Sequence, residues 1–120
     1  MKVLICDDSI LARKQLIDAL KKCDDTLEII EASNGKECVE KKILTSPDIV
    51  FIDIVMPVLD GVSAVKDICA TDHDVTVIIV SSVGTQKELK AAIEAGAKDF
   101  IQKPFSQDQI KEVFDYYLKR

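Results

Sequence analysis

Apolar residues gather in five short runs, and each run is followed by a longer stretch with helical periodicity. The runs predict β-strands at residues 2–6, 26–31, 48–53, 75–80 and 98–102. Between Ile10 and Lys22, the apolar side chains of Leu16, Ile17 and Leu20 share one helical face, and similar stripes follow the other runs. This alternation predicts one α/β domain over residues 1–120, with a parallel sheet between two layers of helices.

Charge placement predicts the order of the strands. The first, third and fourth runs are almost wholly apolar, whereas residues 26–31 and 98–102 carry charged side chains. Charged strands are typical of sheet edges, so the second and fifth strands are expected outside. The result is a doubly wound, flavodoxin-like sheet of order 2-1-3-4-5. Asn34, three residues before Glu37, predicts a helix start, and Gly96 predicts a helix end.

Composition narrows the classes of function. Charged residues make up 31% of the 120 positions and the formal net charge is -5, which argues against direct binding to nucleic acid or an anionic membrane. The first apolar run is too short for a signal peptide or a membrane span, so we expect a cytoplasmic protein. The four cysteines are unevenly spaced in apolar or helical surroundings, and we expect reduced core thiols rather than disulfides or a zinc site.

Polar side chains follow the predicted strands at the edge where a doubly wound sheet has its ligand crevice. Asp7 and Asp8 follow the first strand, Asp53 closes the third, Ser81 follows the fourth and Lys103 follows the fifth. Each alone has an ordinary explanation, such as helix capping by Asp7, Asp8 or their neighbour Ser9. Their convergence on one rim is what indicates a functional site.

Three neighbouring carboxylates require compensation, because two unit charges at 4 Å repel by about 4 kcal/mol at an effective dielectric near 20. One lysine cannot neutralise three acids. Oxygen ligands and a shallow site favour Mg²⁺ over Ca²⁺, and the lack of His or Cys on the rim disfavours zinc. A carboxylate beside Mg²⁺ and a lysine can attack phosphorus to form an aspartyl phosphate, with Ser81 and backbone N–H groups helping to compensate the phosphoryl charge.

The motif Asp53-Ile-Val-Met-Pro-Val-Leu-Asp60-Gly61, with Asp7-Asp8 before it and Lys103-Pro104 after it, resembles the response regulator receiver family. The likeness spans the chain. It implies that Asp53 is the phosphoacceptor, that Asp7, Asp8, Asp53 and the backbone carbonyl of Val55 surround Mg²⁺, and that Lys103 pairs with carboxylate and then phosphate. It also implies a cis peptide before Pro104.

Two further residues match switch positions of the family. Ser81 stands where a threonine is usual, and it keeps the hydroxyl donor. Phe100 stands at the aromatic switch position, often tyrosine, although an aromatic packed in place on an edge strand is an alternative interpretation. In the family, phosphorylation draws the hydroxyl inward and remodels the face made by the fourth helix, fifth strand and fifth helix. Val55 and Val83 are apolar at positions that modulate phosphoryl loss, so we expect slow self-dephosphorylation and no other enzymatic turnover.

The resemblance is strongest to stand-alone chemotaxis receivers of the CheY type. It implies a histidine kinase as phosphodonor, a downstream protein such as a flagellar motor switch, and a monomer or a phosphorylation-dependent dimer. A receiver cut from a chemotaxis methylesterase or another regulator, or a phosphorelay intermediary, stays open at this point.

Three rivals from other classes are weaker. An aspartate-nucleophile phosphatase of the haloacid dehalogenase type needs a second aspartate two residues after the nucleophile, where this chain has Val55. A receiver that signals by binding alone would not need the intact set of acids. A nucleotide-binding module would show a Gly-rich phosphate loop after a strand, and none is present in the sequence.

Overall fold

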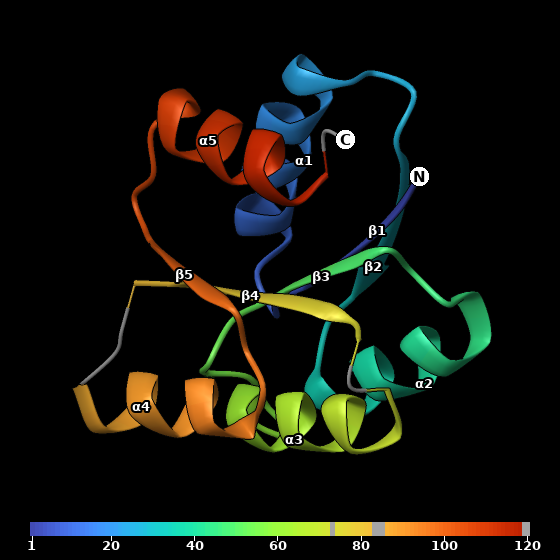
Figure 1. Ribbon diagram of the computed structural model, residues 1–120, viewed down its shortest axis with the longest axis vertical. Helices are drawn as coiled ribbons and strands as arrows, with labels where there is room; N and C mark the ends of the chain where they lie inside the picture. The colour runs from blue at the N-terminus through green and yellow to red at the C-terminus, as the bar shows by residue number, and fades with distance from the viewer. Residues whose placement is uncertain (73, 83–85, 119–120) are drawn as a thin grey trace.

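The computed structural model describes residues 1–72, 74–82 and 86–118, in which five strands alternate with five helices (Figure 1). In chain order the elements are β1 (Lys2–Cys6), α1 (Ile10–Cys23), β2 (Glu28–Ala32), α2 (Gly35–Thr45), β3 (Ile49–Ile52), α3 (Gly61–Thr71), β4 (Thr76–Ser81), α4 (Gln86–Ala95), β5 (Asp99–Gln102) and α5 (Gln107–Tyr117). No described helix has both the length and the apolar character needed to cross a membrane.

All neighbouring strands are parallel, and their order is β2-β1-β3-β4-β5, which confirms the predicted topology. The register places Cys6 beside both Ala32 and Ile52, so the carboxyl ends of β1, β2 and β3 lie level. Strand order reverses between β1 and β3, and this is where such sheets open a crevice for ligands.

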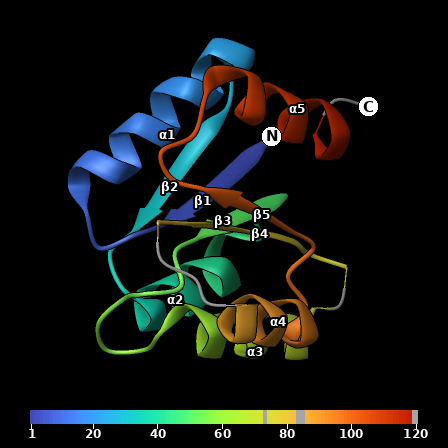
Figure 2. The same cartoon turned by 90° about the vertical axis from the view of Figure 1, so that its left-hand side faces the viewer.

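Helices cover both faces of the sheet, with α1 and α5 on one side and α2, α3 and α4 on the other in both views (Figures 1 and 2). Alternate residues of the central strands supply the two cores: Leu4 and Val50 face α2 to α4, whereas Val3 and Phe51 face α1 and α5. Strands buried on both sides must be apolar throughout, which explains the continuous runs in the sequence.

The ends of the elements follow local hydrogen bonding. Asn34 caps α2 by accepting from the Glu37 N–H, and Gly96 follows α4 with a φ of 125°, so both signals are confirmed. The second strand begins at Glu28 rather than at residue 26. The cause is a turn after α1, in which the Asp24 carboxylate accepts from both the N–H and the hydroxyl of Thr26.

The expectation of four reduced thiols is wrong for two of them. Cys6, the last residue of β1, forms a disulfide with Cys38 in the first turn of α2, and their Cα atoms are 5.9 Å apart. Cys23 and Cys69 are free. The pairing could not be found from spacing, since 32 positions separate the two residues and only the packing of α2 against β1 brings them together.

Candidate functional site

Two acids extend the central strands beyond their last paired residues. The Asp53 N–H donates to the Cys6 carbonyl at 3.0 Å, and the Asp7 N–H donates to the Ala32 carbonyl at 3.1 Å. Each backbone is therefore fixed by the sheet. Both residues are buried, with exposed fractions of 5% for Asp7 and 9% for Asp53. Buried carboxylates need polar partners, because taking an unpaired charge out of water costs several kcal/mol.

Lys103 supplies the common partner. Its Nζ lies 2.5 Å from Asp7 Oδ2 and 3.0 Å from Asp53 Oδ2. The lysine arrives from the loop after β5, where its N–H donates to the Ser81 carbonyl and the Lys103-Pro104 peptide is cis, as expected. Elements far apart in the sequence thus place one ammonium between two carboxylates.

The other oxygen of Asp53 is held separately. Ser81, fully buried at the end of β4, donates its hydroxyl to Asp53 Oδ1 at 2.7 Å. The Val55 N–H donates to the same oxygen at 3.2 Å. Asp53 therefore has one carboxylate oxygen facing a hydroxyl and an amide and the other facing an ammonium, and these donors are of the kinds that stabilise a phosphoryl group.

The charges in this cluster shift the protonation of its members. Burial raises the pKa of the Asp7 carboxyl above its ordinary value, opposed by the hydrogen bonds from Lys103 and the Ser9 N–H. For Lys103, burial lowers the pKa, but hydrogen bonds to Asp7 and Asp53 together with their charges outweigh it, so the net shift is upward. Burial therefore accounts for the upward shift of Asp7, whereas the two neighbouring carboxylates account for that of Lys103.

The third predicted acid lies outside this pair. Asp8 is exposed, and within residues 1–72, 74–82 and 86–118 no three His, Cys, Asp or Glu side chains are grouped so that they could hold a metal ion. A ready-made cage of three carboxylates is therefore not what the structure shows. Mg²⁺ commonly uses only one or two carboxylates and keeps several waters. Asp7 and Asp53, which converge on a single cation, fit that requirement.

The loop between β3 and α3 fixes the backbone around Asp53. Asp60 caps α3 by accepting from the Ser63 N–H, and the Gly61 N–H donates to the Ile54 carbonyl at 2.8 Å. Gly61 must lack a side chain, since a Cβ there would lie 2.1 Å from the Asp53 carbonyl oxygen. The Asp-Gly pair of the motif thus has a structural reason: it lets the start of α3 pack directly on the backbone of Asp53 and Ile54.

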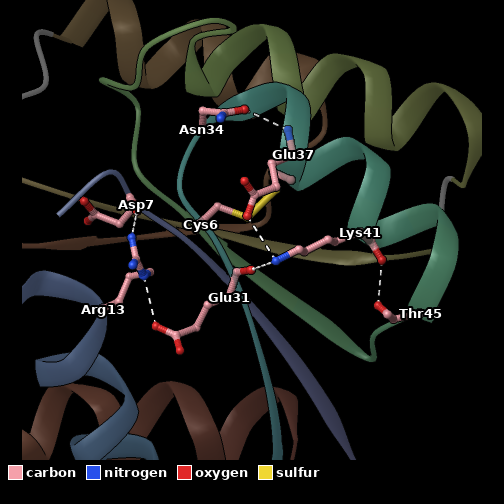
Figure 3. Close-up of a disulfide and its surroundings, with 9 residues drawn as sticks. Cys6, Asp7, Arg13, Glu31, Asn34, Glu37, Lys41 and Thr45 are labelled. Atoms are coloured by element: carbon pink, nitrogen blue, oxygen red, sulfur yellow. Dashed lines mark hydrogen bonds and ion pairs between the residues drawn. A yellow bond between two sulfur atoms is a disulfide. The ribbon is translucent and has the colours of Figure 1, made fainter. Parts of the chain in front are cut away.

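Arg13 belongs to the site and was missed from the sequence, where it appears as one more charge on α1. Its Nη1 donates to the Asp7 carbonyl at 2.6 Å and its Nε pairs with Glu31 at 2.9 Å, as Figure 3 shows. The side chain is only 13% exposed. This contact depends on how α1 packs at the end of β1, so the sequence carried no local signal for it.

The predicted switch positions lie on different parts of the fold. Ser81 contacts Asp53 directly, whereas Phe100, on β5, is half-buried against the apolar core beneath α4. A hollow of about 450 Å³ runs beside Phe100 along β5 and α5, lined also by Gln102, Glu112 and Tyr116. Of the two residues expected to affect phosphoryl loss, Val55 is exposed and Val83 lies outside the described residues.

A family model described as the response regulator receiver domain matches residues 3–115. The chain belongs to the response regulator receiver family. Similar proteins include the chemotaxis protein CheY of Bacillus subtilis (strain 168), which is 42% identical over 118 residues, with 98% of this chain and 97% of that protein covered. A protein-glutamate methylesterase/protein-glutamine glutaminase of Clostridium acetobutylicum is 34% identical over an alignment of 123 positions, which covers 100% of this receiver but 35% of that protein.

A solved structure gives the same picture. A chain of the CheX-CheY-BeF3-Mg+2 complex from Borrelia burgdorferi matches with a TM-score of 0.89 and 33% identity, covering 99% of this receiver and 90% of that chain. The CheY-type likeness thus extends over nearly the full length of both chains, in sequence and in fold.

Proposed function

We propose that this receiver accepts a phosphoryl group from a histidine kinase onto Asp53 and passes the signal on in chemotaxis. The observation that supports this most strongly is the Asp7, Asp53, Lys103 and Ser81 cluster, which surrounds one carboxylate with donors on both of its oxygens. The match to CheY proteins over nearly their whole length supports the chemotaxis assignment. A cytoplasmic location follows from the same proposal.

Different groups of the chain supply the nucleophile and the hydrogen-bond donors for phosphoryl transfer. Asp53 Oδ2 is the nucleophilic oxygen in this proposal, and Lys103 is placed to follow it from carboxylate to phosphate charge. The Ser81 hydroxyl and the Val55 N–H can donate to the incoming phosphoryl oxygens as they now do to Oδ1. Asp7, Asp8, Asp53 and the Val55 carbonyl would hold Mg²⁺. When bound, the ion supplies neutralisation of phosphoryl and carboxylate charge.

Phosphorylation would change what Ser81 and Lys103 contact. Both residues connect to β5, because Ser81 pairs with Gln102 at the end of the strand and its carbonyl accepts from the N–H of the next residue, Lys103. We propose that this link shifts Phe100 and the face of α4, β5 and α5, where a downstream protein such as a flagellar motor switch would bind. In this proposal the protein is a monomer or forms a dimer that depends on phosphorylation.

The decisive experiment is incubation with acetyl phosphate and Mg²⁺, followed by intact-mass measurement. We expect one phosphoryl group on the wild-type chain, none on Asp53→Asn, and unchanged labelling of Asp67→Asn, an exposed acid on α3 that serves as the matched control. Equal labelling of Asp53→Asn and the wild type would reject Asp53 as acceptor. No labelling of the wild type would favour signalling by binding alone.

A further inference from the structure

We propose that Cys6 and Cys38 form a reversible redox pair whose oxidation state controls how readily Asp53 accepts a phosphoryl group. The control half of this inference rests on the proposed function of Asp53, and the redox half stands by itself. The oxidised state is the one described here, with the disulfide joining β1 to α2 (Figure 3).

The position of Cys6 ties the disulfide to the acid cluster. Cys6 directly precedes Asp7, and its carbonyl accepts the Asp53 N–H. One residue therefore fixes the backbone of both acids that Lys103 bridges. The disulfide from the Cys6 side chain to α2 restrains the carboxyl end of β1, next to Asp7.

The other end of the bond reaches the loop that follows Asp53. Cys38 lies one turn into α2, and the preceding Gly35 packs so closely on this loop that a Cβ would lie 1.9 Å from the Leu59 carbonyl oxygen. Lys41 further holds α2 to β2 by donating to the Glu31 carbonyl, and it also pairs with Glu37 of its own helix at 3.0 Å (Figure 3). The disulfide thus links β1, which Asp7 follows, to helix α2, which packs against the loop between β3 and α3.

Formation of the disulfide requires an oxidant, and we infer that this oxidant is a hydroperoxide. Two thiols lose two protons and two electrons to a hydroperoxide, the S–S bond forms, the O–O bond breaks, and water and an alcohol, or two waters from hydrogen peroxide, are released. A small dithiol reverses the step by exchange through its thiolate. Both sulfurs lie in residues no more than 1% exposed, so only small reagents and local opening give access, and each state should persist once formed.

The surroundings suit both oxidation states. Cys6 and Cys38 belong to the apolar core that also contains Ala32 and Ile52, and a reduced cysteine packs there as a small apolar side chain. Disulfides of proteins in reducing compartments are usually transient and redox-sensing rather than structural. For a receiver proposed to work in the cytoplasm, a switchable pair is therefore the expected kind.

The test uses the full chain after prolonged treatment with hydrogen peroxide or with dithiothreitol. After unfolding and alkylation with N-ethylmaleimide, we expect two labels on the oxidised protein, at Cys23 and Cys69, and four on the reduced protein. Acetyl phosphate with limiting Mg²⁺ should phosphorylate the reduced form more slowly, by on the order of 10-fold, since a small misplacement of reacting groups costs this much or more. The Asp7 and Asp53 amides should exchange with deuterium faster in the reduced form.

Two variants separate the pair from the other cysteines. Cys38→Ala should be phosphorylated at the rate of the reduced wild-type protein after both treatments. Cys23→Ala, which leaves the pair intact, should respond to the two treatments as the wild type does. Four labels after peroxide, or equal phosphorylation rates in the two forms, would overturn the proposal. If Asp53 accepts no phosphoryl group in either form, the proposed function fails instead, and labelling together with amide exchange still decides whether the redox pair exists and reaches the site.

Discussion

Replacing Lys103 by methionine tests the electrostatics of the site, because the substitution keeps the length of the side chain and removes its charge. Lys103 Nζ lies 2.5 Å and 3.0 Å from one oxygen each of Asp7 and Asp53. Those two oxygens therefore cannot be more than about 5.5 Å apart. The side chain of Lys103 is 18% exposed, and the side chains of Asp7 and Asp53 alone are 7% and 11% exposed, so water screens the three charges only in part.

The expected loss follows from the repulsion that the lysine compensates. Two carboxylates at about 5.5 Å repel by about 3 kcal/mol at an effective dielectric near 20. Removing one partner of a buried ion pair typically costs about 3 to 5 kcal/mol. We therefore expect Lys103→Met to lower the free energy of unfolding by about 3 kcal/mol in EDTA. Mg²⁺ should restore more stability to this variant than to the wild type, since the lysine charge no longer opposes binding of the cation.

Urea unfolding followed by circular dichroism, in EDTA and in Mg²⁺, measures both effects. Lys66→Met, at an exposed position on α3, is the control for loss of a surface charge. Adding Asp7→Asn should recover much of the stability that Lys103→Met loses. The reasoning is refuted if Lys103→Met is equally destabilised with and without Mg²⁺, or if the Asp7→Asn, Lys103→Met double variant is no more stable than Lys103→Met alone.

Three other predictions concern stability and titration. Val58, 76% exposed with a φ of 71°, is strained, so Val58→Gly should stabilise the protein by about 1 kcal/mol in urea unfolding, and a loss of that size would contradict the strain. Reducing the Cys6–Cys38 bond, which closes a loop of 32 positions, should cost about 4 kcal/mol; equal midpoints with and without dithiothreitol would refute this. Burial, then the hydrogen bond to Asp99 and its charge, raise the pKa of Tyr117 to about 12. The contribution of protonated Tyr117 to the free energy of unfolding should be complete below about pH 10 and disappear as pH rises through 12. Tyrosinate absorbance in a Tyr116→Phe background measures this pKa, and Asp99→Asn should lower it.

The fold could be predicted because its signals are local. Continuous apolar runs mark strands buried on both faces, and the charges of β2 and β5 place these strands at the edges. The error at the start of β2 came from Thr26, which has the composition of a strand residue but is held in a turn by Asp24. A side-chain hydrogen bond of this kind outweighs propensity over a few residues.

The site could be predicted only as far as topology dictates it. Residues that end parallel strands or directly follow them must share one rim, so the meeting of Asp7, Asp53, Ser81 and Lys103 follows from strand order. The contacts of Arg13 and of the Cys6–Cys38 pair depend on how helices α1 and α2 sit on that rim. Helix packing is set by many side chains together, which no spacing rule of a single residue reveals.

The charge balance of the cluster differs from that expected of an ion pair that serves stability alone. A pair that served stability alone would gain most from one acid against one base with every lone pair satisfied, and apolar residues of similar volume would often do as well. Here Asp7 and Asp53 share a single ammonium, which leaves an excess negative charge in the cluster, and burial raises the pKa of Asp7. The sheet holds the backbones of the two acids, and the donors Ser81 and Val55 on Asp53 and Ser9 on Asp7 hold their carboxylates. A cation that bound to this cluster would be expected to lower its energy further. Such forgone stability is what the proposed role in binding Mg²⁺ and accepting a phosphoryl group would require.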